Sequence, residues 1–374
     1  AARSRFRRPR RCAPFLFGLA GRAGRVHPGG YSVTGFGAVI TGAEGYRLTP
    51  GEKAFFREVK PLGFILFARN IDTPDQVRAL CHELREAAGH EAVITIDQEG
   101  GRVMRIKWGE YTPPPARDIG KIYAADKHRG IELARLNAYV IASELNEHGI
   151  TANCAPVADI LTDKTHGVIG DRAFGDNPQE VAKLSSAAIS GFLTGGVWPV
   201  IKHIPGHGRA TADSHNELPQ VDSPLEELEQ NDFVPFAMNA ECPFMMTAHI
   251  CYVALDKENC ATQSSAILYD VIKERLGMKG LIVSDDINMN ALQGSVKDRY
   301  LKTLEAGCDL VLYCSGNIEG KVKDNMFEEL ETLAGLASVE KQAYEKLKTL
   351  PHLVGYDYGH REQAIERIKE LLNG

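Results

Sequence analysis

Ionisable side chains gather in three segments of the sequence, each directly after a short apolar run. The first run ends at Asp97, and Arg105 follows beyond the pair Gly100–Gly101, which permits a tight turn. A carboxylate and a guanidinium accept from and donate to hydroxyl groups, so together they suit a substrate rich in hydroxyls. The structural alternative is that Asp97 caps a turn and Arg105 pairs with it.

The second segment carries most of the candidate acid/base groups. Lys202 and His203 end an apolar run, and Asp213 and His215 follow in a long polar loop. Long polar loops at strand ends are usually functional. Because Asp213 and His215 stand two residues apart, a bend in the loop lets the carboxylate orient the imidazole and stabilise its protonated form. The pair is therefore a candidate general acid/base.

A metal site is the alternative use of these histidines. The side chains of His203, His207, Asp213 and His215 are of the types that bind zinc. Lys202 argues against this use, because an ammonium beside a dication is repelled unless an anion lies between them. We therefore expect no metal and no other cofactor, and a structural role for His207, whose glycine neighbours indicate a turn.

The third segment is an acidic pair. Asp285 and Asp286 follow Ser284 at the end of an apolar run, and successive strand side chains point to opposite faces. One of the two acids can therefore face a substrate as a nucleophile, while capping of a helix is the alternative for any one of the three residues. Elsewhere, Arg172 in a glycine-bounded turn either contacts substrate or only pairs with Asp171.

Eight short, nearly continuous apolar runs recur along the chain and must position these segments. Such runs are typical of strands that are buried on both faces of a parallel sheet. They are Gly37–Thr41, Gly63–Ala68, Ala92–Asp97, Ile150–Ala155, Val197–His203, Phe244–His249, Gly280–Asp285 and Asp309–Cys314.

Helix-like stretches separate the runs. One of them, Pro224–Ala240, begins with a capping box at Ser223 and a proline in the first turn. Strand followed by helix, eight times over, predicts an α/β fold: a single-domain (β/α)8 TIM barrel over residues 37–374, with C-terminal helices packed outside. A doubly wound sheet would give a similar pattern. In a barrel the carboxyl ends of the strands share one face, so the three ionisable segments are expected to meet there.

The composition, with 44% hydrophobic and 25% charged residues, is that of a soluble globular chain. A net charge of −6 gives no large positive field, and no apolar run is long enough to span a bilayer, so we expect neither nucleic acid nor membrane as a partner. Residues 1–43 hold eight arginines and no acid, which leaves −14 on the rest of the chain. We interpret residues 1–36 as a basic flexible extension. A secretory signal is the weaker alternative, because the apolar patch Ala13–Ala20 is short.

The cysteines indicate the compartment. All eight are dispersed without a C-x-x-C spacing, so zinc ribbons and dithiol redox sites are not expected. Cysteines inside apolar runs, such as Cys154 and Cys308, usually behave as small buried hydrophobes. This usage is typical of a reducing compartment and predicts a cytoplasmic protein.

Five motifs give the chain a resemblance to a known family. From about Gly35 to its C-terminus it is similar to family 3 glycoside hydrolases of the bacterial single-domain β-N-acetylhexosaminidase type, enzymes of cell-wall recycling. The motifs are I-D-Q-E-G-G-R-V at 96–103, I-G-D-R-A-F at 169–174, K-H-I-P-G-H-G at 202–208, D-S-H at 213–215 and S-D-D-I-N-M at 284–289.

The resemblance implies a retaining exo-β-N-acetylglucosaminidase. Its substrates would be muropeptide fragments (GlcNAc-1,6-anhydro-MurNAc-peptides) of peptidoglycan recycling, from which it removes the non-reducing terminal N-acetylglucosamine. It implies that Asp285 is the nucleophile, that His215 is the general acid/base and that Asp213 forms a dyad with it. The residues implied to hold the sugar are Asp97, Arg105, Arg172, Lys202 and His203.

A histidine acid departs from the carboxylate pair that most retaining glycosidases use. An imidazole is neutral after it has given up its proton, so it repels neither a carboxylate-bearing substrate nor an anionic acceptor. This leaves phosphorolysis and a broader family 3 β-glycosidase as alternatives. Two further hypotheses are a metal-dependent TIM-barrel hydrolase that uses His203, His207 and His215, and a non-catalytic sugar-binding relative. We expect a monomer whose partner is the carbohydrate substrate.

Overall fold

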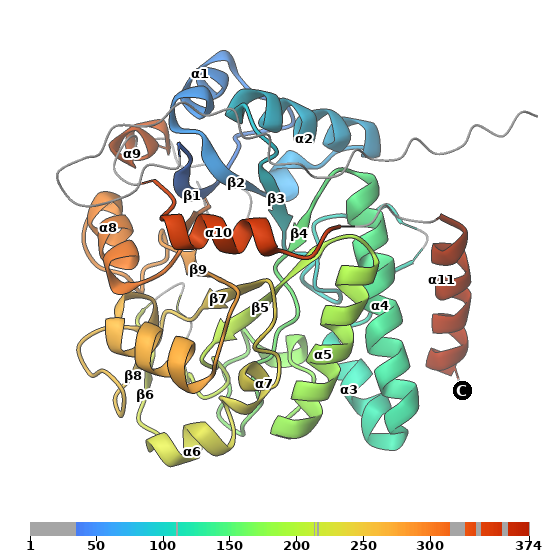
Figure 1. The fold of residues 1–374 in the computed structure, drawn as a ribbon. Coiled ribbons are helices and arrows are strands. Elements are labelled where there is room, and N and C mark those ends of the chain that lie inside the picture. Colours follow the sequence, from blue (N-terminus) through green and yellow to red (C-terminus); the bar gives the residue numbers. More distant parts are fainter. Residues whose placement is uncertain are drawn as a thin grey trace, which may run out of the picture.

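Eight parallel strands close into a barrel, and helices wrap its outside (Figure 1). The structure is a computed structural model and describes residues 35–109, 111–212, 214, 217–314, 326–333, 338–353 and 358–373. The strand order around the barrel is β1-β10-β9-β7-β5-β4-β3-β2, and β1 pairs with both β10 and β2. The predicted (β/α)8 barrel is confirmed, and the open, doubly wound sheet is excluded.

The barrel strands coincide with the eight predicted apolar runs. They are β1 (Gly37–Gly42), β2 (Pro61–Leu66), β3 (Val93–Ile96), β4 (Ala152–Asn153), β5 (Trp198–Ile204), β7 (Phe244–Thr247), β9 (Leu281–Asp286) and β10 (Leu310–Tyr313). A second, two-stranded sheet pairs β6 (Gln220–Val221) with β8 (Cys251–Tyr252). It joins the segment that follows β5 to the segment that follows β7.

The helices begin where the sequence provides caps. Thr49 and Thr73 each accept a hydrogen bond from a main-chain amide of the first turn, and a proline follows each of them. The α-helices are α1 (Pro50–Val59), α2 (Pro74–Ala88), α3 (Ala116–Ala125), α4 (Lys127–Glu147), α5 (Pro178–Thr194), α6 (Leu225–Gln230), α7 (Val234–Ala237), α8 (Val296–Ala306), α9 (Met326–Leu333), α10 (Lys341–Thr349) and α11 (Tyr358–Asn373). The other helices are the 3-10 turns η1 (Ala68–Asn70), η2 (Gly170–Arg172) and η3 (Ala261–Gln263), and the π-helix η4 (Ile267–Arg275).

The predicted helix Pro224–Ala240 is wrong as one element, because it is two helices, α6 and α7, with a break at residues 231–233. Pro235 explains the break, since in a continuous helix its ring would clash with the carbonyl of Asn231 and it has no amide proton to donate. The predicted capping box is absent as well. The Ser223 hydroxyl instead accepts a hydrogen bond from Arg209 Nη1 at 3.3 Å.

The barrel interior explains how the strands present ionisable groups at one end. A small apolar cavity of about 10 Å³ inside the barrel is lined by alternate strand residues, including Thr95 of β3, Val200 of β5 and Val283 of β9. Asp97, Lys202 and Asp285 stand two positions further along these strands. Because strand side chains alternate with a period of two, all three point toward the same interior at its carboxyl end.

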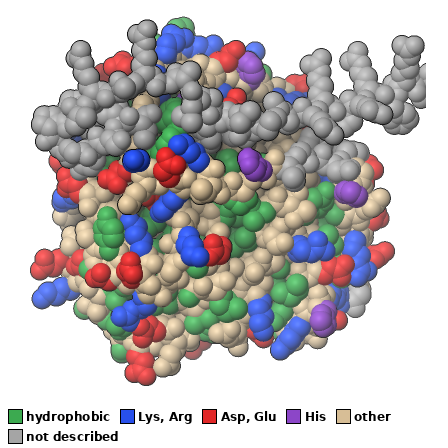
Figure 2. Space-filling view, in the orientation of Figure 1, with side chains coloured by type: hydrophobic (Ala, Val, Ile, Leu, Met, Phe, Trp, Pro, Cys, Tyr) green, Lys and Arg blue, Asp and Glu red, His purple; other side chains and the backbone are tan. Residues whose placement is uncertain are grey.

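The described surface is mixed in charge. On the face shown in Figure 2, acidic and basic side chains lie among each other rather than in separate patches. None of the described helices is both long and apolar enough to cross a bilayer. Residues 1–34, most of the predicted basic extension, lie outside the described residues.

Candidate active site

Three of the predicted sugar-binding residues meet at the barrel mouth. Lys202 Nζ donates to Asp97 Oδ1 at 2.9 Å, and Arg105 Nη2 lies 3.4 Å from the other oxygen of the same carboxylate. Lys202 is almost completely buried, with 2% of its surface exposed, so its ammonium stays charged only because carboxylates surround it. An ion pair between Lys202 and Asp97 therefore connects the end of β5 to the loop after β3.

Glu99, which the sequence reasoning did not select, connects this group to Arg172. Its two carboxylate oxygens accept from Arg172 Nε and Nη2, both at 2.8 Å, and Lys202 Nζ lies 2.6 Å from Oε1. Arg172 ends η2, so Glu99 joins three segments of the chain. Its spacing of two from Asp97 was a usable signal, because residues two apart in an extended segment share a face.

Opposite charges offset the cost of burying this cluster. Burial alone would raise the pKa of Asp97 and Glu99, but Lys202 and the arginines hold the pKa of both carboxyls below the ordinary range. Burial alone would lower the pKa of Lys202 and Arg172, and the two carboxylates raise it above the usual value instead. The cluster therefore keeps fixed donors and acceptors at neutral pH.

His203 is turned toward Asp159, a second residue that the sequence reasoning missed. His203 Nδ1 lies 2.7 Å from Asp159 Oδ2, while Asp159 Oδ1 accepts from the main-chain amides of His203 and His207 at 3.2 and 2.7 Å. Burial alone would raise the pKa of Asp159, but the imidazole of His203 and these hydrogen bonds lower it to about 2. An acid inside the apolar run Ala155–Ile160 was the available signal, because a buried carboxylate needs partners.

His207 lies buried behind His203. Burial, and next the imidazole of His203, lower the pKa of His207 to about 4. Its Nε2 lies 3.4 Å from Ser214 Oγ, and the Ser214 carbonyl accepts from Ala291 N at 3.2 Å. Ser214 thus lies against the segment that follows β9. Its sequence neighbours, the predicted Asp213–His215 dyad, lie outside the described residues.

Asp285 lies at the end of β9 with its carboxylate oriented by the main chain. Its Oδ1 accepts from the amide of Asp286 at 2.8 Å. Asp286 points elsewhere, as the alternation predicts, and its Oδ1 accepts from the amides of Asn288 and Cys314, both at 3.0 Å. Burial raises the pKa of Asp286 to about 6, and the charge of Asp285 acts in the same direction.

The buried thiol of Cys154 shows that the acidic and basic groups converge. Burial raises its pKa to about 12; the charge of Asp97 adds to that effect, Lys202 opposes it, and Asp285 contributes in turn. Cys154 lines the barrel cavity together with Thr95, Val200 and Val283, and Asp97, Lys202 and Asp285 each stand two positions beyond one of these residues, at the carboxyl end of the strands. The carboxylate of Asp285 therefore lies at the same end of the barrel as the fixed hydrogen-bonding groups.

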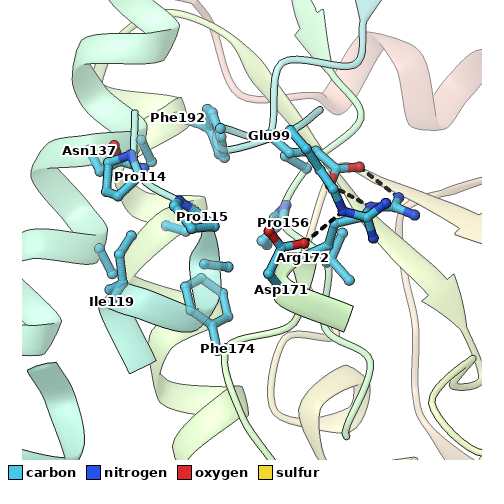
Figure 3. A pocket seen from close by; sticks show the side chains of 18 residues that line it. Glu99, Pro114, Pro115, Ile119, Asn137, Pro156, Asp171, Arg172, Phe174 and Phe192 are labelled. Carbon is cyan, nitrogen blue, oxygen red and sulfur yellow. Dashed lines mark hydrogen bonds and ion pairs between the residues drawn. The ribbon is translucent and has the colours of Figure 1, made fainter. Parts of the chain in front are cut away.

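A cavity of about 30 Å³ lies next to this cluster, between the end of β3 and helices α3, α4 and α5 (Figure 3). Glu99 and Arg172 line one side, and Pro114, Phe174 and Phe192 line the apolar remainder. This volume holds one or two water molecules rather than a sugar ring. The cavity is therefore too small to be the substrate site.

Within the part of the chain that the structure describes, no group of three or more histidine, cysteine, aspartate or glutamate side chains could hold a metal ion. His203 is instead engaged by Asp159, and His207 lies next to Ser214. His215, the third member of the alternative metal set, lies outside the described residues. The arrangement of the described groups is that of a site for charge-assisted hydrogen bonding to hydroxyls beside a carboxylate.

Comparison with known proteins shows the family of this chain. Residues 53–348 match the model of the glycosyl hydrolase family 3 N-terminal domain. A relative from Chromobacterium violaceum named β-hexosaminidase is 35% identical over 344 residues, which are 88% of this chain and 95% of the relative. A relative of the same name from Thiobacillus denitrificans is 39% identical over 257 residues, 68% of this chain and 71% of its own.

The solved structures agree with this result. NagZ from Neisseria gonorrhoeae, crystallised in complex with N-trifluoroacetyl-D-glucosamine, superimposes with a TM-score of 0.80 at 29% sequence identity, covering 90% of this chain and 98% of that chain. The match extends over the barrel and its helices, since it covers most of both chains. The chain belongs to glycosyl hydrolase family 3.

Proposed function

We propose that the protein is a retaining exo-β-N-acetylglucosaminidase that removes the non-reducing terminal N-acetylglucosamine from muropeptide fragments during peptidoglycan recycling. The observation that carries the proposal is Asp285, placed at the barrel mouth beside the Asp97–Lys202–Glu99–Arg172 cluster. The β-hexosaminidase names of the relatives and the glucosamine derivative bound to the Neisseria protein support this choice of sugar.

The sugar-binding roles follow from the types of the side chains. Carboxylate oxygens of Asp97 accept from sugar hydroxyls, while Arg105, Arg172 and Lys202 donate to hydroxyl or carbonyl oxygens. His203 is held by Asp159 through Nδ1, so its other ring nitrogen is the one available for the sugar in this proposal. Because these groups already pair with one another, the site is organised before the sugar arrives, which reduces the entropy cost of binding.

The first step forms a covalent intermediate. The carboxylate of Asp285 attacks the anomeric carbon, the bond from that carbon to the leaving oxygen breaks, and its electron pair stays on that oxygen. His215 gives its proton to the same oxygen, and Asp213 stabilises the charged imidazole beforehand.

The second step returns the enzyme to its starting state. A water molecule attacks the anomeric carbon of the glycosyl-enzyme, and its proton goes to His215, which now acts as a base. The bond between the anomeric carbon and Asp285 breaks, and the sugar leaves with its original β configuration. We further propose that the enzyme acts as a monomer in a reducing cytoplasm, where the cysteines of the described region remain free thiols.

The test of this function is an Asp285→Ala variant assayed with 4-nitrophenyl N-acetyl-β-D-glucosaminide. We expect a loss of at least about 10³-fold in kcat/KM, because the covalent route is removed. Activity near that of the wild-type protein would contradict the role of Asp285. Product analysis on a 1,6-anhydro-muropeptide, with and without inorganic phosphate, then separates hydrolysis from phosphorolysis: free N-acetylglucosamine in both mixtures supports hydrolysis, and a sugar phosphate contradicts it.

A further inference from the structure

His249 is a buried histidine at the end of β7 that contacts the strand of the proposed nucleophile. Its side chain is completely buried. Nε2 lies 3.0 Å from the main-chain carbonyl oxygen of Asp286, and Nδ1 lies 2.7 Å from the hydroxyl of Thr262 in η3. Both nitrogens of the ring therefore have a partner, and one partner belongs to the residue directly after Asp285.

The hydrogen-bond partners assign the protons of this group. A carbonyl oxygen only accepts, so the proton between His249 and Asp286 is on Nε2. Thr262 Oγ1 lies 2.7 Å from His249 Nδ1 and 2.8 Å from Thr247 Oγ1. Thr262 Oγ1 also lies 3.1 Å from the carbonyl oxygen of Ala248, which can only accept, so its one proton is shared between that carbonyl and Nδ1. The two threonines thus hold the orientation of the ring.

The contact lies beyond the end of the strand pairing. The main-chain ladder of β7 and β9 pairs Met246 with Val283 as its last rung. Past that rung the ring of His249 joins β7 to the carbonyl of Asp286. On the other side, the amide of Ile287 donates to the carbonyl of Leu312 in β10 at 3.0 Å. The peptide group between residues 286 and 287 is therefore held from both neighbouring strands.

Asp286 transmits this restraint to Asp285. The Asp286 amide donates to Asp285 Oδ1 at 2.8 Å, while the Asp286 carboxylate accepts from the Cys314 amide at 3.0 Å. Rotation of the main chain at Asp286 would break the contact with His249 and would also turn the amide that orients the nucleophilic carboxylate. Attack on an anomeric carbon requires the reacting atoms to be aligned at about 3–3.5 Å, and a displacement of about 1 Å can cost on the order of 10²-fold in rate.

We infer that His249 is a positioning residue for glycosyl transfer: the Thr247–Thr262–His249 chain of hydrogen bonds holds the main chain at Asp286, and through it the carboxylate of Asp285. This inference rests on the proposed role of Asp285 as the nucleophile. His249 touches neither substrate nor the reacting atoms in this scheme. Its effect is on the rate of bond formation rather than on the binding of the sugar.

The experiment compares two matched pairs of variants. His249→Gln keeps an N–H donor for the Asp286 carbonyl, whereas His249→Leu removes it at a similar volume. Thr262→Ser keeps the hydroxyl that fixes Nδ1, whereas Thr262→Val removes it. For each variant we would measure the single-turnover rate constant with 4-nitrophenyl N-acetyl-β-D-glucosaminide, the dissociation constant of N-acetylglucosamine, and Tm.

We expect His249→Leu to slow the single-turnover step about 10²-fold and Thr262→Val about tenfold, with dissociation constants for N-acetylglucosamine within about threefold of wild type. His249→Gln and Thr262→Ser should recover most of each loss. If His249→Leu does not fold, the comparison of Thr262→Val with Thr262→Ser tests the inference instead, because it asks whether the Thr262 hydroxyl is needed. Recovery by the conservative variants separates positioning from a general loss of stability, which Tm reports.

Other outcomes overturn the inference. Rate constants near wild type in both His249→Leu and Thr262→Val, or a loss that appears only in N-acetylglucosamine binding, would show that the contact does not position the nucleophile. The Asp285→Ala variant separates this failure from failure of the proposed function. If Asp285→Ala is inactive while His249→Leu is not slowed, only the role of His249 is wrong; if Asp285→Ala is active, both assignments are wrong.

Discussion

At the scale of single residues, Glu99 connects the charged side chains at the barrel mouth to one another. It holds Arg172 by two hydrogen bonds and Lys202 by a third contact, and only 7% of its side chain is exposed. Both of its oxygens are therefore used within the protein. Its function is to fix the two cations that we propose contact the sugar, rather than to contact the sugar itself.

We predict that Glu99→Gln lowers kcat/KM about 10²-fold, because Arg172 and Lys202 lose the group that orients them. It should also destabilise the protein by about 3 kcal/mol, since removing one charge of a buried pair leaves the other uncompensated. Steady-state kinetics with the chromogenic substrate and urea denaturation measure the two effects.

The control is Glu132→Gln, because Glu132 makes the same two-bond pair with Arg367, at 2.9 and 2.9 Å, on the surface of the molecule. Surface pairs contribute little, so this variant should keep the wild-type kcat/KM and stability. Similar behaviour of the two variants would mean that the buried position of Glu99 has no special role.

At the scale of elements, the end of β9 makes the free energy of unfolding depend on pH through the carboxyl of Asp286. The carboxyl of Asp286 has its pKa raised to about 6 by burial, whereas in the unfolded chain it titrates near the ordinary value of about 3.9. The folded state therefore binds this proton more tightly. Its stabilising contribution is complete below about pH 4 and is lost as the pH rises through about 6.

Asp286→Asn removes this titration and keeps an oxygen that accepts from the amides of Asn288 and Cys314. We predict that the variant gains stability relative to wild type as the pH rises from about 4 to 7, by about 2 kcal/mol. Thermal unfolding at several pH values measures the difference. A difference between the two proteins that is constant with pH would contradict a raised pKa at Asp286.

The loop after β5 packs closely on the segment after β4, and glycine is what allows it. A Cβ at Gly208 would lie 1.6 Å from the carbonyl oxygen of Ile160, which belongs to the main chain and cannot turn away. We predict that Gly208→Ala destabilises the fold by about 3 kcal/mol or prevents folding. Gly51→Ala is the matched control, because its Cβ would lie 3.9 Å from the nearest atom, Thr49 Oγ1, in helix α1. That variant should unfold at the wild-type temperature or slightly above it.

At the scale of the whole molecule, the sequence predicts the barrel well because its strands are buried on both faces. Continuous apolar runs mark all eight, and the carboxyl-end rule then brings Asp97, Lys202 and Asp285 together from distant segments. For Glu99 and Asp159 the sequence offers only a weak signal, a spacing of two from Asp97 and an acid inside an apolar run, and neither signal identifies the partners that these carboxylates meet in the fold. The predicted helix Pro224–Ala240 is too long, because Pro235 cannot continue the hydrogen bonding of α6.

The contacts of His249 could not be predicted from the sequence. In the sequence it ends an apolar run and has no recognisable spacing with Thr262 or Asp286. Its partners are 13 and 37 residues away in the chain, on different elements of the barrel. The contact forms only because β7 and β9 pair side by side in the folded barrel.

We also predict that the protein as a whole works without a metal ion. Dialysis against a strong chelator should leave kcat/KM unchanged, because the proposed chemistry uses a carboxylate, an imidazole and water. Loss of activity that added zinc restores would favour the alternative in which His203, His207 and His215 bind a metal.

The central claim is a covalent sugar on Asp285, and trapping tests it most directly. The protein would be incubated with the 5-fluoro derivative of N-acetylglucosaminyl fluoride, whose second fluorine slows breakdown of the intermediate, and then digested with trypsin. We predict one sugar attached to peptide 280–297 at Asp285, as fragmentation in a mass spectrometer would locate it. A sugar on Asp286 or on another peptide, or turnover without any adduct and with an inverted product, would contradict the account.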